Sequence, residues 1–388
     1  MKILVNGVQL LAPLTGIGQY VRYLFTAMEN MAATDVHVFY GRNFRPGVSL
    51  PSARKAQLLR QGHELLQRFL PNPRALRKAL ERQCFAWQAR KFGKDCIYHE
   101  PNFIALPYDG PLVLSIHDLS CFDHPEMHPE ERVRLMQRDL PGSIERADQI
   151  IVISQATGLA LQRWFGVAPA RINLTYLAAD ARYHPRAGVL LQATLARFGL
   201  VPGEYVLSVG TLEPRKNLPA LFAAHAGLPE ALRQRFPLVV AGMRGWHQAE
   251  ALNASSAAMA RGELRLLGYV PDAAVPDLYA GAAAFAYPSR YEGFGLPPLE
   301  AMASGVPVIT SNRTSLPEVV GSAGLMVDPD DVDGLREGLR RLLEDRVFAA
   351  TLGEAGRLRS RSFSWERCAR ETQAVYAKVL QQRGLGSS

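Results

Sequence analysis

The sequence predicts an α/β protein made of two doubly wound domains, and three observations support this prediction. The chain has 388 residues, which is long for one hydrophobic core and makes two domains the natural expectation. Short apolar, β-branched runs alternate with helical patterns in both halves, as in βαβ units with parallel sheets. A content of 48% hydrophobic and 21% charged residues suits a globular protein with a large core.

The first half contains six expected strands with helical patterns between them. The strands are Lys2–Val8, Val36–Tyr40, Cys96–His99, Leu112–His117, Gln149–Ser154 and Ile172–Tyr176, and the helices include Gln19–Met31 and Pro129–Arg146. Asn6 and Gln9 interrupt the first apolar run too early for a signal peptide. No stretch approaches the roughly 20 apolar residues of a spanning helix. The four cysteines are scattered and lack metal-binding spacing, which is typical of a cytoplasmic protein with ordinary thiols.

The second half repeats the alternation. The expected strands are Tyr205–Gly210, Pro237–Gly242, Leu264–Val270, Ala282–Tyr287, Pro307–Ser311 and Leu325–Val327. Turn signals within Arg182–Gly203 mark a domain boundary. We therefore expect an N-terminal domain over residues 1–185 and a C-terminal domain over residues 186–363. A final helix, within residues 364–388, has no strand after it and could pack back on the N-terminal domain. Open α/β sheets bind ligands at the carboxyl ends of their strands, which predicts a cleft between the domains.

Residues 287–305 combine the features of an anion site. An apolar strand runs through a Gly-rich loop into a helix that begins at Pro297-Pro298 and ends at Gly305. A strand, a glycine loop and a helix N-terminus in this order favour anion binding. Glu300 lies in the first helical turn, where it can also compensate the helix dipole. Glu292, in the loop, has no such structural explanation.

Polar clusters follow strands in both halves. Gly16 and Gly18 would let the backbone approach a phosphate or sugar, although a tight turn explains them equally well and the dinucleotide fingerprint is absent. His117 closes an apolar strand and is expected to face the cleft, with loop capping as the alternative. Arg215 and Lys216 are adjacent cations after a strand, which suits a diphosphate better than a solvated turn.

Two further loops have less specific patterns. Tyr269 and Val270 follow the strand Leu264–Val270 and could bracket a nucleobase, but ordinary turn chemistry is as good an explanation. The two D-x-D spacings in Asp328–Asp333 could hold a divalent metal, yet their place before a helix favours N-capping. Walker and G-x-S-x-G patterns are absent from the sequence. We expect neither a metal nor a cofactor.

The formal charge of +8 suggests an anionic partner, and much of it comes from one stretch. Residues 53–94 contain 11 Lys and Arg against two Glu, with leucines and aromatic residues interleaved. This pattern fits docking on an anionic membrane surface. Helices packed on the first sheet with a solvated basic face are an equally good explanation. Nucleic acid is not expected, because no DNA-reading motif accompanies the charge.

Together these motifs resemble those of the retaining glycosyltransferases of family 4, which have the GT-B fold of two Rossmann-like domains facing a cleft. Glu292–Glu300 matches the E-x7-E motif of that family and encloses Gly293-Phe294-Gly295. Further matches are Pro288-Ser289, Ala303–Val308, Leu316-Pro317-Glu318, Gly324, Gly16-Ile17-Gly18, His117 and Arg215-Lys216. The resemblance covers nearly the whole chain.

The resemblance implies roles for the matched residues. Glu292 would hold hydroxyls of the donor sugar, and Glu300 would hold the ribose. Arg215 and Lys216 would neutralise the departing diphosphate. The residues expected to approach the donor through their backbone, or to contact the sugar near its reactive carbon, are Gly16, Phe294, Gly295, Leu296 and His117. Many relatives carry Arg directly after the glycine of the basic loop, where this chain has Thr211.

The segments Glu213–Asn217 and His117–Leu119 resemble those of bacterial mannosyl- and rhamnosyltransferases that use GDP-sugars. The expected partners are then a nucleotide-sugar donor and a lipid-linked or oligosaccharide acceptor at the inner face of the membrane. Two alternatives remain open. A non-hydrolysing nucleotide-sugar epimerase shares this architecture, and a non-catalytic nucleotide-sugar-binding subunit would bind the donor without turnover.

Overall fold

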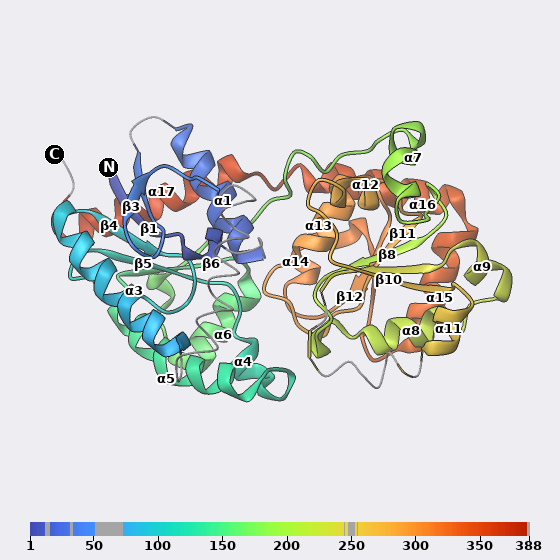
Figure 1. Ribbon diagram of the computed structural model, residues 1–388, viewed down its shortest axis with the longest axis horizontal. Coiled ribbons are helices and arrows are strands. Elements are labelled where there is room, and N and C mark those ends of the chain that lie inside the picture. Colours follow the sequence, from blue (N-terminus) through green and yellow to red (C-terminus); the bar gives the residue numbers. More distant parts are fainter. Residues whose placement is uncertain are drawn as a thin grey trace.

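The computed structural model contains two separate sheets, each covered by helices on both faces and lying side by side (Figure 1). It describes residues 1–11, 16–31, 34–50, 73–243, 245–246, 253 and 255–385. Residues 53–72 of the basic stretch 53–94 therefore lie outside the described residues. The prediction of two doubly wound α/β domains is confirmed.

The N-terminal sheet has the strand order β3-β2-β1-β4-β5-β6-β7. Its strands are β1 (Lys2–Asn6), β2 (Asp35–Phe39), β3 (Phe44–Pro46), β4 (Ile97–Glu100), β5 (Leu112–Ile116), β6 (Gln149–Val152) and β7 (Ile172–Leu174). All neighbours are parallel except β2 and β3. Strands β4, β5 and β6 are buried along their whole length, which explains their continuous apolar runs.

The helices of this domain follow its strands. They are α1 (Gly16–Glu29), α3 (Pro73–Ala89), α4 (Ser120–Asp123), α5 (Glu130–Arg146) and α6 (Gln155–Phe165). Helix α6 has a well-defined start, because the Ser154 side chain accepts a hydrogen bond from the Thr157 N–H, and it ends at Gly166 in the left-handed conformation.

The C-terminal sheet has the order β10-β9-β8-β11-β12-β13, with every pair parallel. Its strands are β8 (Val206–Val209), β9 (Leu238–Ala241), β10 (Leu264–Gly268), β11 (Ala284–Tyr287), β12 (Val308–Ser311) and β13 (Leu325–Val327). The helices are α7 (Gly188–Ala196), α8 (Leu218–Ala226), α9 (Glu230–Arg235), α11 (Ser256–Ala260), α12 (Val275–Ala280), α13 (Leu296–Ala303), α14 (Leu316–Val320), α15 (Val332–Glu344) and α16 (Arg346–Ser360). Both sheets direct the carboxyl ends of their central strands toward the space between the domains (Figure 1).

The last helix, α17 (Trp365–Gln382), crosses back from the C-terminal domain and packs on α1 and β6 (Figure 1). Its inner face is buried, and the Tyr376 hydroxyl lies 2.6 Å from His99 Nδ1 in the N-terminal core. Trp365, at the start of α17, lies 5.5 Å from the Tyr23 ring of α1, measured between ring centroids. The last helix of the chain thus completes the packing of the N-terminal domain.

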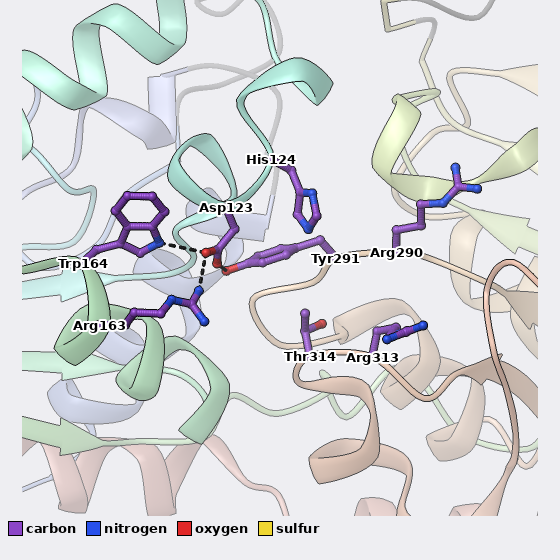
Figure 2. A pocket seen from close by; sticks show the side chains of 8 residues that line it. All are labelled: Asp123, His124, Arg163, Trp164, Arg290, Tyr291, Arg313 and Thr314. Atoms are coloured by element: carbon purple, nitrogen blue, oxygen red, sulfur yellow. Dashed lines mark hydrogen bonds and ion pairs between the residues drawn. The ribbon is translucent and has the colours of Figure 1, made fainter.

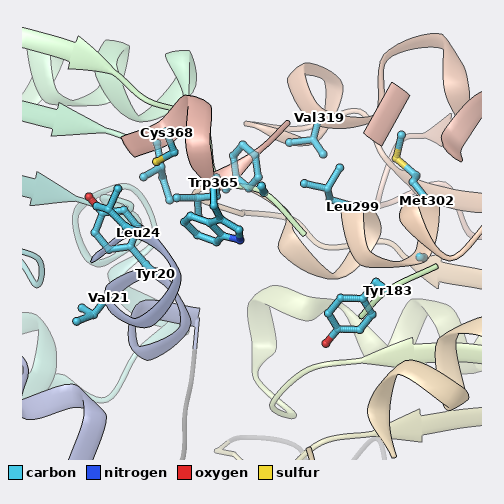
Figure 3. Packing of buried hydrophobic residues seen from close by; sticks show 14 of the residues in the cluster. Tyr20, Val21, Leu24, Tyr183, Leu299, Met302, Val319, Trp365 and Cys368 are labelled. Atoms are coloured by element: carbon cyan, nitrogen blue, oxygen red, sulfur yellow. The ribbon is translucent and has the colours of Figure 1, made fainter. Parts of the chain in front are cut away.

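One buried apolar cluster is continuous between the domains (Figure 3). It joins Tyr20 and Leu24 of α1 to Trp365 of α17, and continues to Leu299 of α13 and Val319 of α14. Polar contacts add to it. Glu318 of α14 accepts hydrogen bonds from the backbone N–H groups of Gln155 (2.7 Å) and Ala156 (2.9 Å), at the start of α6. A helix N-terminus favours such a carboxylate, so this contact ties the two domains together.

Candidate active site

A cleft of about 670 Å³ lies between the two domains. Of the twelve predicted site residues, eleven line it: Gly16, His117, Arg215, Lys216, Tyr269, Val270, Glu292, Phe294, Gly295, Leu296 and Glu300. Gly18 does not. Helix α1 already begins at Gly16, and Gly18 is buried within its first turn, so its expected approach to a ligand is not seen.

The topology explains why these residues meet. His117 follows β5 in the centre of the first sheet. Arg215 follows β8, and Glu292 follows β11 next to it in the second sheet. Because parallel strands end at a common edge, loops far apart in the sequence converge on one cleft. Tyr269 follows β10 at the far edge of the sheet and is 64% exposed, so it lies on the rim of the cleft.

Glu292 is the centre of a buried ionic cluster. Its carboxylate accepts hydrogen bonds from Lys216 Nζ (2.7 Å), Arg215 Nη1 (2.9 Å) and Ser289 Oγ (2.6 Å). Burial alone would raise the pKa of Glu292, but the charges of Arg215 and Lys216 overcome it and lower the pKa to about 2. Lys216 also contacts the Tyr287 hydroxyl. Both cations are therefore held in place at the cleft floor.

The pKa values of the two cations move in opposite directions. Burial, assisted by the neighbouring charge of Arg215, lowers the pKa of Lys216. The pKa of Arg215 stays high because Glu292 and Glu213 outweigh its own burial, and Arg215 Nε donates to Glu213 at 2.8 Å. Arg215 is thus a permanent positive charge in the cleft.

The loop that carries Glu292 is fixed by short side chains. The Glu292 N–H donates to Thr314 Oγ1 (3.0 Å), and Ser315 Oγ lies within hydrogen-bond distance of the carbonyl oxygens of Glu292 and Phe294. Gly295 has a φ of +111°, which few residues with a side chain tolerate, and it directly precedes α13. Pro297 and Pro298 follow and have no N–H groups, so the donors at this helix start are those of Leu296 and the residues just before it.

The two domains are in close contact at Gly293. A Cβ atom at this position would lie 2.0 Å from the carbonyl oxygen of His117, so only glycine fits. Thr157 Oγ1 lies beside this point, 3.3 Å from His117 O. The histidine loop of the first domain and the glutamate loop of the second domain therefore share one wall of the cleft.

His117 is held as a neutral acceptor. Its Nε2 lies 2.7 Å from the carbonyl oxygen of Pro101, and a carbonyl can only accept, so Nε2 carries the proton and Nδ1 is the acceptor. Burial lowers the pKa of His117. Tyr20 and Phe103 enclose the ring, with centroids at 4.9 and 5.8 Å. A ring fixed in this way can accept a hydrogen bond from a ligand hydroxyl.

Glu300 lines the cleft near Tyr279 and Tyr183. Burial raises its pKa to about 7, against the opposing influence of these hydroxyls and of the charge on Arg182. A carboxyl group with this pKa changes its charge near neutral pH. Arg182 itself forms a two-pronged pair with Asp272, with Nη2 at 2.7 Å from Oδ1.

The structure also brings in residues that were not among the twelve predicted site residues. Tyr287 and Ser289 contact Lys216 and Glu292 directly, and their place beside the motif could have indicated them. Arg132 of α5 also lines the cleft, but a single arginine on a long helix gives no sequence signal. Asp118 lines the cleft, and its carboxylate accepts from the Ser120 N–H at 3.0 Å at the start of α4.

Of the D-x-D residues, Asp331 serves the capping role that the sequence predicts. Asp331 caps α15 by accepting from the Gly334 N–H at 2.8 Å. Asp328 and Asp330 pair with Arg313 (2.7 Å) and Arg290 (2.6 Å). Within the described part of the chain, no group of three or more His, Cys, Asp or Glu side chains is arranged to hold a metal ion. Over the same residues, no helix is long and apolar enough to span a bilayer.

Comparison with known proteins agrees with this architecture. Residues 14–183 match the family described as Glycosyltransferase Family 4, and residues 199–359 match Glycosyl transferases group 1. Sucrose-phosphate synthase from Thermosynechococcus elongatus superposes with a TM-score of 0.74 at 21% identity, over 98% of this chain and 99% of that one. HepE from Anabaena, in complex with UDP and glucose, gives a TM-score of 0.71 at 18% identity, over 97% and 100%. The fold is therefore GT-B.

The curated relatives are more similar in sequence. O-antigen chain mannosyltransferase B of Escherichia coli is 39% identical over 386 residues, which cover 97% of this chain and 99% of that protein. The serotype-specific mannosyltransferase WbdA of Escherichia coli is 34% identical over 241 residues, 61% of this chain and 29% of WbdA. This chain belongs to the glycosyltransferases of family 4.

Proposed function

We propose that this glycosyltransferase moves a hexosyl unit, with mannose favoured over rhamnose, from a GDP-sugar to a lipid-linked saccharide, with retention of anomeric configuration. The buried Arg215–Lys216–Glu292 cluster at the floor of the interdomain cleft carries the proposal, because it provides paired cations where a leaving diphosphate needs them. The preference for mannose rests on the 39% identity to a mannosyltransferase over nearly the full length.

The chemistry follows from charge. Breaking the anomeric C–O bond leaves a nucleoside diphosphate and a sugar with oxocarbenium character. Arg215, Lys216 and the N–H groups at the start of α13 would stabilise the diphosphate. The acceptor hydroxyl attacks from the same face, and its proton passes to an oxygen of the departing phosphate. These groups supply the charge stabilisation that a metal provides in other enzymes, which is why we propose a metal-independent reaction.

In this scheme Glu292 exchanges its two cationic partners for hydroxyl groups of the donor sugar. Without donor it neutralises Lys216 and Arg215. When a diphosphate takes over those cations, the carboxylate becomes available to accept hydrogen bonds from sugar hydroxyls. His117 would accept another through Nδ1, and Glu300 would hold the ribose. Arg215 and Lys216 then exchange the Glu292 carboxylate for the diphosphate, and no buried charge is left uncompensated.

A donor screen tests the nucleotide and the sugar. GDP-mannose, GDP-rhamnose, UDP-glucose and UDP-N-acetylglucosamine are compared by thermal shift. A donor present at about 100 times its Kd should add roughly 2.7 kcal/mol to the free energy of unfolding. We expect GDP-mannose to give the largest shift, and equal shifts with the UDP-sugars would contradict the assignment of the base.

A transfer assay tests the reaction itself. GDP-mannose is incubated with a mannose-terminated lipid-linked oligosaccharide, and the new linkage is examined by NMR. We expect an α-linked product and the same rate in EDTA. A β-linked product would refute retention, and a loss of rate that Mg²⁺ or Mn²⁺ restores would refute metal independence. Conversion of the free nucleotide-sugar without acceptor would instead favour an epimerase.

We further propose that the enzyme works at the cytoplasmic face of a membrane and docks through the basic stretch. Leu80 and Trp87 of α3 are seven positions apart, so they share a helix face, and they are 53% and 61% exposed. Lys91 lies over the Trp87 ring at 4.4 Å. An apolar stripe flanked by cations suits the boundary of an anionic bilayer. The test is flotation with phosphatidylglycerol vesicles, and failure to float would remove this part.

A further inference from the structure

A second hollow between the domains, of about 490 Å³, has a wall that suits a sugar ring (Figure 2). It is lined by residues of α4 and α6 from the first domain and by the loops after β11 and β12 from the second. None of its described lining residues also lines the donor cleft. Tyr291 lines this hollow, and the next two residues of the chain, Glu292 and Gly293, line the donor cleft. We propose that this second hollow binds mannosyl units of the acceptor glycan at a distance from the reacting end.

Trp164 is the first reason for this proposal. It is a large aromatic side chain, 47% exposed, on the wall of the hollow. Its ring is nevertheless fixed, because Nε1 donates to Asp123 Oδ1 at 2.8 Å and the ring packs on Phe122 at 5.8 Å between centroids. A preorganised aromatic face can cover the apolar C–H face of a pyranose at little cost in conformational entropy.

Asp123 joins both domains around this ring (Figure 2). Its carboxylate accepts hydrogen bonds from Trp164, from Arg163 and, at 3.0 Å, from the hydroxyl of Tyr291 in the second domain. Tyr291 directly precedes Glu292. A ligand in the hollow therefore contacts groups of both domains, one residue away from the ionic cluster of the donor cleft.

The charges of the hollow favour a neutral polar ligand over an anion. Arg163, Arg290 and Arg313 each already have a carboxylate partner, respectively Asp123, Asp330 and Asp328. A polyanion would have to displace these partners. Each guanidinium carries five N–H donors in total, and these ion pairs use one or two of them. The remaining donors, together with the Thr314 hydroxyl, match the acceptor oxygens of sugar hydroxyls.

Acceptor length tests this inference, which rests on the proposed transfer of mannose. Initial rates are measured with GDP-mannose and either α-mannobiose or α-mannooctaose, for the wild type and for Trp164→Ala. We expect the variant to raise KM for mannooctaose roughly tenfold, with kcat and the KM for mannobiose unchanged. Trp164→Phe keeps a ring and should recover part of the affinity. Leu159→Ala, an exposed residue of the same helix that is 65% accessible, is the matched control.

A binding measurement separates failure of this inference from failure of the proposed function. Mannooctaose is titrated calorimetrically into protein whose donor cleft is saturated with GDP, with inorganic pyrophosphate as a competitor. Loss of binding in Trp164→Ala supports the site even if no transfer occurs. Equal binding by the wild type and the variant, or no binding at all, overturns it. Displacement of the glycan by pyrophosphate, or equal changes in KM for both acceptors, would overturn it too, since the first indicates an anion site and the second a general defect.

Discussion

At the scale of single residues, the cleft is organised by one carboxylate with three hydrogen-bond donors. Glu292 is 7% exposed, yet its pKa is lowered, because Lys216, Arg215 and Ser289 all direct donors at it. A buried charge of this kind is stable only where opposite charges and hydrogen-bond donors compensate it. The cluster is therefore a preorganised electrostatic site, and its parts should not be interchangeable.

Lys216→Ala should reduce transfer by roughly 10²–10³ in kcat, because a cation that stabilises the leaving diphosphate is lost. The fold should remain, since Arg215 still neutralises Glu292. The measurement is steady-state kinetics beside circular dichroism. Lys2→Ala, an exposed lysine in the first strand, serves as the control. Near-normal turnover in Lys216→Ala would exclude the leaving-group role.

If Glu300 holds the donor ribose as proposed, donor binding should depend on pH. Its pKa is raised to about 7, so the carboxylate that would accept hydrogen bonds from the ribose forms only as the pH rises through about 7. We expect the affinity for GDP-mannose to rise about tenfold or more across this range, because hydrogen bonds to a charged group are the stronger ones. Calorimetric titration at several pH values measures it.

Glu300→Gln should flatten this pH profile, and GDP-mannose suits the test because its diphosphate does not titrate near neutrality. An unchanged slope in the variant would assign the dependence to another group. The stability of the unliganded fold should change with pH in the opposite direction to the donor affinity. A carboxyl group whose pKa is raised on folding stabilises the unliganded fold at low pH, and this contribution is lost as the pH rises toward the folded-state pKa.

At the scale of elements, the strands and helices were largely predictable, because β-branched runs and turn residues report local structure. Most of the predicted strands extend one or two residues too far at their carboxyl ends, since residues such as His117 and Gly210 belong to the loops that leave the sheet. Strand β3 was missed because three residues, Phe44–Pro46, pair antiparallel at the edge and have no apolar run. The glutamate motif and the basic pair were recognisable from spacing. The Glu318 contact with α6 was not, because it depends on how two domains meet.

Tyr376→Ala tests how much of the N-terminal domain depends on α17. The side chain is fully buried and its hydroxyl partners His99, so its loss should cost roughly 3–5 kcal/mol of the free energy of unfolding. Urea denaturation measures this. Arg370→Ala, on the exposed face of the same helix, should change the free energy by about 0.5 kcal/mol or less. Similar small effects in both variants would mean that α17 is only loosely attached.

At the scale of the whole molecule, the described domains meet through an apolar cluster and a few polar contacts. Glu318 holds the start of α6, Tyr291 reaches Asp123, and Trp246 Nε1 donates to the carbonyl oxygen of Met127 at 2.9 Å. The polar contacts are individually modest, so the relative position of the domains should respond to the loss of one of them.

Glu318→Ala should weaken the closed arrangement, because it leaves two N–H groups of α6 without their carboxylate. A helix cap is worth about 0.5–2 kcal/mol, which corresponds to a loss of roughly 2- to 30-fold in donor affinity if closure accompanies binding. Small-angle X-ray scattering should show a larger radius of gyration for the free variant. Glu337→Ala, on the exposed face of α15, is the control, and identical scattering and affinity in all three proteins would contradict the role.

The return of α17 to the first domain has a consequence for how the chain is made. A ribosome releases the first sheet and its helices long before it reaches Trp365. Until then the apolar surface of α1 on which α17 packs is exposed, and it includes Tyr20 and Leu24. A domain ordinarily folds as soon as it emerges from the ribosome. The half that is translated first is therefore finished last, and a premature stop near the end of the message should damage the beginning of the protein.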